Sequence, residues 1–259
     1  MHPWERNAAN LAAALSFYGR VTLEPGLRLI TSWVEHPVFN IALLDGPAPD
    51  PPGQEATELD RRIERAEAHY RARNRSWSFW VCEHLVGPRT MRRIARIFDA
   101  HGMASIGEPP GMEADELPPP ARPLPPLEIL PATEARVRED FAGIAHQCFF
   151  IPPHLAREVY LDPARWGAPV QILVGYAGGR AVTAAAFIEA AGALGIYSVG
   201  TIPGYRGRGY AEAIMRHGVD EFRRQGVRGP LVLQSTPAGM DLYRRLGFRR
   251  VTRYFVFSK

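Results

Sequence analysis

The chain of 259 residues is poor in cysteine and in long apolar runs, and each shortage excludes a class of protein. Its two cysteines, Cys82 and Cys148, are too few for a disulfide framework or a structural zinc site, so we expect no metal. No run approaches the ~20 apolar residues of a membrane helix. Glu5 and Arg6 precede the apolar stretch 11–18, and no small-residue cleavage site follows it, which argues against a signal peptide. These shortages predict a cytoplasmic protein with no membrane partner.

Lysine is almost absent as well, because Lys259 is the only one and the net charge of +4 rests on arginine. Residues 1–125 hold 14 arginines and 16 acidic residues, whereas residues 126–259 hold 17 basic and 11 acidic residues. The basic second part predicts an anionic ligand. Nucleic acid is one alternative, but no finger, helix-turn-helix or aromatic RNA-binding motif supports it, and we expect no nucleic-acid partner.

Proline is abundant in one place, with eight prolines between Pro109 and Pro126. Runs of proline cannot continue a helix or a central strand, so this segment is expected to be an extended connector. The predicted domains are residues 1–117 and 128–259, joined by a linker over 118–127. Hydrophobic residues make up 46% of the chain and charged residues 22%, values typical of folded domains with a sizeable core.

Hydrophobic periodicity predicts helices and strands in a similar order in both parts. The first part is expected to hold, in sequence, a helix, two strands, a helix, a strand and a helix that starts after Thr90, over residues 4–18, 27–34, 38–44, 56–70, 78–83 and 90–102. The second part is expected to hold helices over 134–147, 156–160, 211–222 and 238–246, and strands over 171–177, 182–189, 193–202, 231–234 and 251–257.

The similar order of elements indicates an internal duplication. Two anchors align the two parts. Phe98 lies four residues before Gly102, and Tyr243 lies four residues before Gly247. Met103 and Phe248 each follow the glycine.

A glycine- and arginine-rich turn between a predicted strand and a predicted helix is the most informative segment. It contains Arg206-Gly-Arg-Gly-Tyr-Ala211. Gly207 and Gly209 let the backbone approach a ligand closely, and the free N–H groups at the start of a helix favour negative charge. A pyrophosphate is therefore the expected guest. The Lys-[Ser/Thr] of a nucleoside-triphosphate loop is missing, and Glu212 breaks a dinucleotide fingerprint.

This turn resembles the (Gln/Arg)-x-x-Gly-x-(Gly/Ala) loop of the GCN5-related N-acetyltransferase (GNAT) family. The later segment Leu242-Tyr-Arg-Arg-Leu-Gly-Phe248 is similar to a helix of the same family, and the resemblance covers about residues 126–259. It implies a mixed α/β fold, a largely antiparallel sheet flanked by helices, in two tandem GNAT-like domains. It also implies that acetyl-CoA lies in a V-shaped gap between the strands 193–202 and 231–234.

The resemblance implies a set of site residues. The backbone of Val199, Gly200 and Thr201 would pair with the pantetheine arm and the acetyl carbonyl, and Tyr243 would protonate the departing thiolate. Many members have Asn seven residues before this tyrosine, where this chain has Thr236, which bears on the contacts to CoA. The pyrophosphate would be held by the turn, that is by Arg206, Gly207, Arg208, Gly209, Tyr210 and Ala211.

The sequence does not identify the acceptor. Glu189, near a strand end, is the candidate base. His146 and Cys148 are close enough in sequence to suggest a nucleophile pair, although helical spacing explains their proximity. Phe149 and Phe150 are expected to line an acceptor pocket or to belong to the core.

The first part of the chain has lost these features. Its corresponding loop, residues 45–55, contains acids that would repel a pyrophosphate and prolines that offer no N–H. Phe98 stands in the tyrosine position and has no proton to give. We therefore expect a degenerate first domain that does not bind CoA and that covers the acceptor site or replaces a dimer partner.

The sequence thus predicts an acetyl-CoA-dependent N-acetyltransferase. Its second domain would transfer acetyl to a primary amine by direct attack, in a monomer or weak homodimer. The alternative is a non-catalytic acyl-CoA-binding sensor or interaction protein.

Overall fold

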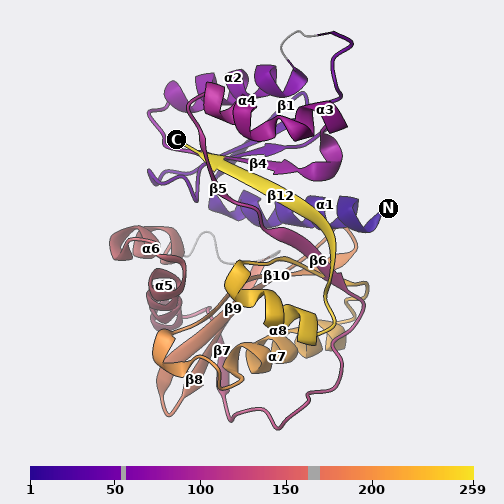
Figure 1. Cartoon of the computed structure of the whole chain (residues 1–259). Coiled ribbons are helices and arrows are strands. Elements are labelled where there is room, and N and C mark those ends of the chain that lie inside the picture. The colour runs from indigo at the N-terminus through magenta and orange to yellow at the C-terminus, as the bar shows by residue number, and fades with distance from the viewer. Residues whose placement is uncertain (54–56, 163–169) are drawn as a thin grey trace.

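The structure is a computed structural model that describes residues 1–53, 57–162 and 170–259, and two halves share one sheet in it (Figure 1). The first half contains these elements in order: α1 (Pro3–Leu15), β1 (Arg20–Glu24), β2 (Leu27–Thr31), β3 (Ile41–Leu44), α2 (Glu58–Arg71), β4 (Ser78–Cys82), α3 (Pro88–Arg92), α4 (Ile94–Ala100), β5 (Ala104–Gly107) and β6 (Pro110–Ala114).

The second half begins with a strand after the proline segment. Its elements are β7 (Glu128–Pro131), α5 (Ala135–Phe149), α6 (Pro153–Tyr160), β8 (Val170–Ala177), β9 (Arg180–Ala190), β10 (Ala193–Thr201), α7 (Tyr210–Arg224), β11 (Leu231–Gln234), α8 (Met240–Arg245) and β12 (Arg249–Ser258). This mixed α/β architecture with a mostly antiparallel sheet confirms the predicted fold class. None of the described helices is both long and apolar enough to cross a bilayer.

The two halves exchange strands. The strand order is β1-β2-β3-β4-β12-β6-β11-β10-β9-β8-β7, and β5 pairs with β12. The last strand, β12, leaves the second half and pairs with β4 from Tyr254↔Cys82 to Ser258↔Ser78. In return, β6 pairs with β11 in the second half. In Figure 1, β12 is the yellow arrow that rises among the strands of the first half. These pairings cross the predicted boundary, so the division at residues 117 and 128 remains a prediction.

The proline-rich segment is the main correction to the secondary structure expected from sequence. Part of it is a central strand, β6, whose Met112 and Ala114 are buried. Pro110 is tolerated there because it is the first residue of the strand. Thr90 does not cap a helix as predicted, because it lies inside α3, which Gly87 caps. The short strands β1, β5 and β7 were not predicted at all.

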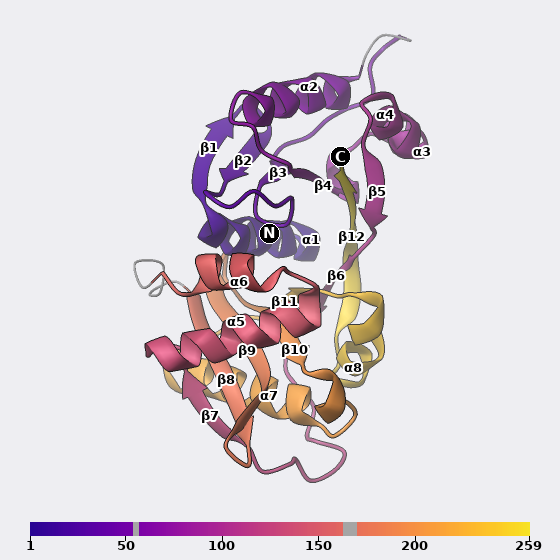
Figure 2. The same cartoon turned by 90° about the vertical axis from the view of Figure 1, so that its left-hand side faces the viewer.

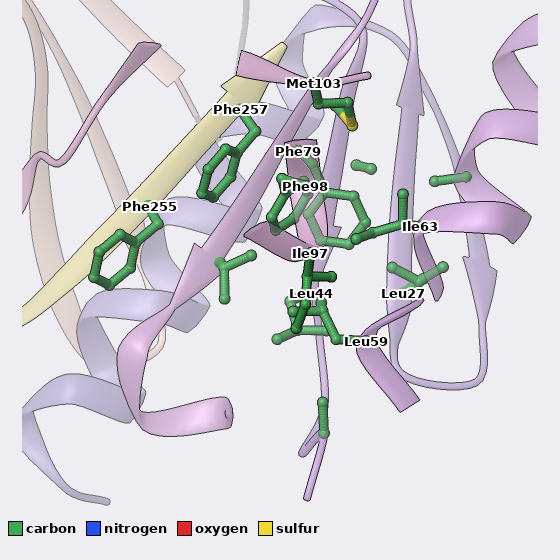
Figure 3. Packing of buried hydrophobic residues seen from close by; sticks show 14 of the residues in the cluster. Leu27, Leu44, Leu59, Ile63, Phe79, Ile97, Phe98, Met103, Phe255 and Phe257 are labelled. Atoms are coloured by element: carbon green, nitrogen blue, oxygen red, sulfur yellow. The ribbon is translucent and has the colours of Figure 1, made fainter. Parts of the chain in front are cut away.

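The core of the first half is completed by residues from the other end of the chain. Phe98 is fully buried and stacks on Phe257 of β12, with ring centroids 3.8 Å apart and planes 4° apart. Phe79 meets Phe98 edge to face at 5.4 Å. Figure 3 shows Phe255 and Phe257 entering this cluster from β12. Full burial of one such side chain is worth about 1.5–3 kcal/mol, so the exchanged strand contributes substantially to this core.

Helix α1 lies between the two halves (Figure 2) and packs on the strands of the second. Asn7 donates to one carbonyl of β6 at 3.0 Å and one of β11 at 3.2 Å. Asn10 donates to carbonyls of β9 and β10 at 2.9 and 3.1 Å. Both asparagines are fully buried, and Arg6 pairs with the buried Glu113 at 2.9 Å. Because buried amides without partners are costly, these bonds hold α1 in one position on the sheet.

The sheet of the second half is covered on both faces. Successive residues of a strand point to opposite faces. Accordingly, Ile172 and Val174 pack in the cluster that contains α5 and α6, whereas Leu173 packs in the cluster that contains α7.

Candidate active site

Strands β10 and β11 diverge, as expected for a gap that holds a ligand arm. They pair in parallel at only two positions, Leu194↔Leu231 and Gly195↔Val232. Beyond these, β11 continues along β6, and β10 bulges between Tyr197 and Gly200 against its other neighbour, β9. The backbone of β10 after the bulge therefore has no partner strand on the side of the gap among the described residues.

A cleft of about 1300 Å³ opens at this divergence and collects most of the predicted site residues. Those that line it are Val199, Gly200, Thr201, Arg206, Gly207, Gly209, Tyr210, Ala211, Thr236 and Tyr243. Two predicted residues are not part of the lining. Arg208 is exposed and stacks over the ring of Tyr205 at 5.2 Å. Glu189 is exposed and precedes the turn between β9 and β10, so the structure does not bring it to the cleft.

The start of α7 is open to an anion. Gly207 and Gly209 have φ values of 76° and 89°, which side-chain-bearing residues rarely adopt. Gly209 is the N-cap residue, so no side chain satisfies the first amides of the helix. These N–H groups lie at the positive end of the helix dipole. A phosphate group would accept their hydrogen bonds and also place negative charge at that end.

In the first half, α2 is the helix that the predicted duplication aligns with α7, and its start is closed. Thr57 caps α2 by accepting from the amide of Asp60 at 3.1 Å, and the Asp60 carboxylate accepts from the amide of Thr57 at 2.7 Å. Two orphan donors are thereby satisfied within the chain. The buried Arg62 also draws the preceding loop inward, because its guanidinium donates to the carbonyls of Gly46 and Pro47, each at 2.6 Å.

The first half also lacks the gap between strands. Strands β3 and β4 pair in parallel from Ile41↔Ser78 to Leu43↔Trp80. Past the end of β3 the contact resumes at the Ala48–Val86 bridge, where Ala48 donates its N–H to Leu85 at 2.6 Å. A ligand arm would have to break these bonds to enter.

Arginines from two segments meet at the open turn. Arg206 donates its Nε–H to the carbonyl of Thr201 at 2.9 Å. Arg122, from the proline-rich connector, reaches the carbonyl of Gly207 at 3.5 Å and lines the cleft. The neighbouring Pro125 lies 3.2 Å from the position that a Cβ on Gly209 would take. Sequence reasoning missed Arg122, because a single arginine among prolines carries no signal of its own.

Tyr243 projects from α8 into the same cleft and is only 8% exposed. Burial raises the pKa of its phenol to about 12, so it holds its proton at neutral pH. The ring meets Phe248 edge to face at 5.9 Å. A Cβ on Gly239 would lie 2.7 Å from this ring, so the glycine leaves room for the tyrosine.

His146 and Cys148 do not make a hydrogen bond with each other in the structure. The Nδ1 atom of His146 is 2.8 Å from the carbonyl oxygen of Ile151. Burial raises the pKa of the Cys148 thiol, against a smaller lowering by Arg206. The thiol borders Gly200, where an added Cβ would lie 3.0 Å from its sulfur. This arrangement does not activate a nucleophile.

The first half contributes one wall of the cleft. Leu11 and Leu15 of α1, Tyr18 just after it and Trp80 of β4 all line the cavity. Trp80 is half-buried and faces this space. The sequence could not show which residues of the first half reach the site, because that depends on how the halves dock. Within the described ranges, no group of three or more His, Cys, Asp or Glu side chains could hold a metal ion.

Comparisons with known proteins agree with this geometry. Residues 129–248 match the model of the acetyltransferase (GNAT) family. A GCN5-related N-acetyltransferase from Kribbella flavida has a similar structure, with a TM-score of 0.74 at 19% identity, over 100% of this chain and 96% of that one.

Two further structures are similar. A functionally unknown conserved protein from Staphylococcus epidermidis ATCC 12228 has a TM-score of 0.65 at 13% identity, with 93% and 94% of the two chains covered. A tandem GNAT protein from the clavulanic acid biosynthesis pathway has a TM-score of 0.54 at 13% identity, over 90% of this chain and 78% of that one. A search of curated proteins finds no match. The chain thus has the fold of tandem GNAT proteins, and its residues 129–248 belong to the acetyltransferase (GNAT) family.

Proposed function

We propose that this protein is an N-acetyltransferase that moves the acetyl group of acetyl-CoA to a primary amine. The observation that carries the proposal is that the uncapped start of α7, the divergent backbone of β10 and Tyr243 all border one cleft. Acyl transfer is the activity that the fold and the family support in general.

The residues present fit coenzyme A. The amides of Gly207 to Ala211 and the guanidinium of Arg206 would hold the pyrophosphate, with Arg122 closing over the turn from the connector. The backbone of Val199 and Thr201 faces no partner strand on the side of the gap and would bind the pantetheine arm there as a further strand would. Thr236 borders the same space and offers a hydroxyl where an amide is common in the family.

The chain's own groups would then support the transfer. Acetyl-CoA supplies the acetyl thioester, and the amine attacks its carbonyl carbon directly. The backbone N–H groups of Val199–Thr201 would stabilise the negative charge that develops on the carbonyl oxygen. Tyr243 would give its proton to the leaving sulfur, and the proton that the nitrogen loses as the amide forms would return to the phenolate, directly or through water. Its raised pKa keeps the phenol protonated at neutral pH, so the proton is available when the thiolate departs. Glu189 receives no role in this scheme, because it lies outside the cleft lining.

The first half is proposed to bind no CoA of its own. Its helix start is capped by Thr57 and Asp60, its strands do not diverge, and Phe98 is packed in the core. In this scheme the first half forms the wall of the cleft on the side where the acceptor binds.

The test uses the full chain, since the second half borrows β6 and α1 from the first. Acetyl-CoA is titrated calorimetrically, and thiol release is followed with a panel of primary amines. Tyr243→Phe is expected to lower kcat by about 10²–10⁴ with CoA affinity unchanged, the range typical of lost proton transfer.

The matched control is Tyr254→Phe. This phenol is also buried, but it lies outside the cleft lining and donates to Asn7 at 2.8 Å. The change should therefore lower stability and leave kcat unaltered. Acetyl-CoA binding without acetylation of any amine would leave the protein as an acyl-CoA-binding module. Absence of binding would refute both functions.

A further inference from the structure

The cleft has two chemically different ends. The charged side chains of its described lining all come from the connector, the turn before α7, or helices α7 and α8: they are Arg122, Arg206, Glu212, Arg216 and Arg245. Glu212, the acid among them, is paired with Arg216 at 2.8 Å. The charge therefore gathers where the pyrophosphate would lie.

The opposite end is apolar and comes mainly from the first half and from the end of α5. Leu11, Leu15, Trp80 and Phe149 contribute aliphatic and aromatic surface there. Its polar groups include two phenols, Tyr18 and Tyr160, whose oxygens are 3.5 Å apart.

Both phenols are neutral. Burial raises the pKa of Tyr18, against smaller lowering by hydrogen bonds with Tyr160 and Ser198, and burial raises the pKa of Tyr160 further. The two hydroxyls hydrogen-bond with each other, and that of Tyr18 also with Ser198, so they bring polarity to this end without charge. This end thus offers neutral hydrogen bonding and no described carboxylate.

Large apolar side chains also remain exposed at this cleft. The exposed large hydrophobic residues among the described positions are Met1, Leu23, Val38, Ile106 and Phe150, and the last three line it, at 43%, 59% and 90% exposure. Phe150 additionally has a φ of 57°, an unusual backbone for a bulky residue. Apolar side chains gathered at a concave site mark a surface that a ligand covers.

An ammonium group would lose its hydration in such a pocket without gaining a counter-charge. Desolvation disfavours the charged form of an amine, so the uncharged amine, which is also the nucleophile, is the form this pocket accepts. No carboxylate is then needed to take a proton from an ammonium group before the attack, and the proton released afterwards can go to the Tyr243 phenolate. Polyamines and other polycations would have to bury further charges and are disfavoured.

We infer that the acceptor is a primary amine that carries an aromatic or bulky aliphatic group, bound as the neutral amine between the first half and the end of α5. This inference rests on the proposed acetyl transfer and specifies its substrate class.

The test compares three amines at saturating acetyl-CoA on the full chain: 2-phenylethylamine, ethanolamine and putrescine. Burial of the phenyl group should raise kcat/KM for 2-phenylethylamine about 10- to 100-fold over ethanolamine, with putrescine poorest. Equal or better turnover of ethanolamine or putrescine overturns the inference and leaves the proposed function standing.

If none of these three amines is acetylated, the wider amine panel and acetyl-CoA binding decide the proposed function, and calorimetry on the CoA-saturated protein decides the inference alone. Heat with 2-phenylethylamine and none with ethanolamine supports an apolar amine site; no heat with either overturns it.

A variant pair localises the effect. Phe150→Asn removes the ring, and Asn tolerates positive φ, so the backbone is not strained further. We expect kcat/KM for 2-phenylethylamine to fall about 3- to 10-fold, as partial loss of an apolar contact implies, with ethanolamine unchanged. Leu23→Thr removes a comparably exposed apolar side chain from β1, outside the cleft, and should change neither amine. Equal losses for both amines in Phe150→Asn contradict the inference.

Discussion

The turn before α7 gives the sharpest quantitative test, through Gly209→Ala. The backbone at Gly209 has a φ of 89°, and an added Cβ would lie 3.2 Å from Pro125. An L-residue pays about 1–2 kcal/mol in the left-handed region. If the turn holds its shape, this strain lowers the free energy of unfolding by that amount.

If the turn instead relaxes, its amides rotate away from the phosphate position. One hydrogen bond to a charged group contributes about 1.5–3 kcal/mol, so the Kd for CoA would rise about 10- to 150-fold. The strain must therefore appear as a lower free energy of unfolding, as a weaker affinity for CoA, or as a part of each.

Two glycines of the same segment serve as controls. Gly204 has no positive φ and open space around its Cβ position, so Gly204→Ala should alter Kd by less than about twofold, as for ordinary surface changes. Gly207 has a φ of 76° with open space, so Gly207→Ala isolates the backbone strain from the contact with Pro125.

The assay is calorimetric titration of CoA and of pantetheine, which lacks the pyrophosphate, beside chemical denaturation. Whatever affinity for CoA Gly209→Ala loses, its affinity for pantetheine should stay unchanged. The reasoning is refuted if this variant binds CoA and unfolds as the wild type does, or if both ligands weaken equally.

Three further outcomes are expected. Asn7→Ala should lower the unfolding free energy by about 2–4 kcal/mol in chemical denaturation, because two strand carbonyls and the Tyr254 hydroxyl lose their buried partner; an unchanged midpoint would contradict this role. The acid Tyr243 acts protonated and loses its proton only as pH rises through about 12, so kcat should not fall between pH 7 and 10, whereas a phenol with a pKa of about 10 would already be half ionised at pH 10. Arg122→Gln should weaken CoA several-fold and flatten the salt dependence of its Kd, while pantetheine binding stays constant.

The site features that sequence predicted are those encoded in neighbouring residues. The turn from Arg206 to Ala211 combines its glycines, its charges and the start of a helix within six positions, so its open amides follow from local geometry. The position of Tyr243 relative to Gly247 is equally local. The turn and Tyr243 therefore both border the cleft, as the sequence predicted, while their chemical roles stay predictions.

Features that depend on pairing between distant segments of the chain could not be predicted from the sequence. The strand pattern of β12 fits an edge of either half, and only the docked structure selects β4 and β6. Glu189 has the right residue type and lies on a predicted strand, but sequence could not tell that it precedes the β9–β10 turn and lies outside the cleft lining. Likewise, β6 could not be recognised among the prolines, although Pro110 is its first residue, a position where a central strand accepts proline.

The position of β12 between β4 and β6 also bears on how the protein is made. During synthesis, every other strand emerges before β12, so both halves wait with an open edge where it will insert. Such edges are templates for pairing with other chains, and the interval before β12 is released is the period of greatest aggregation risk. A translation product that stops short of Arg249 would keep the whole anion-binding turn and Tyr243, yet it would leave the continuous sheet split in two.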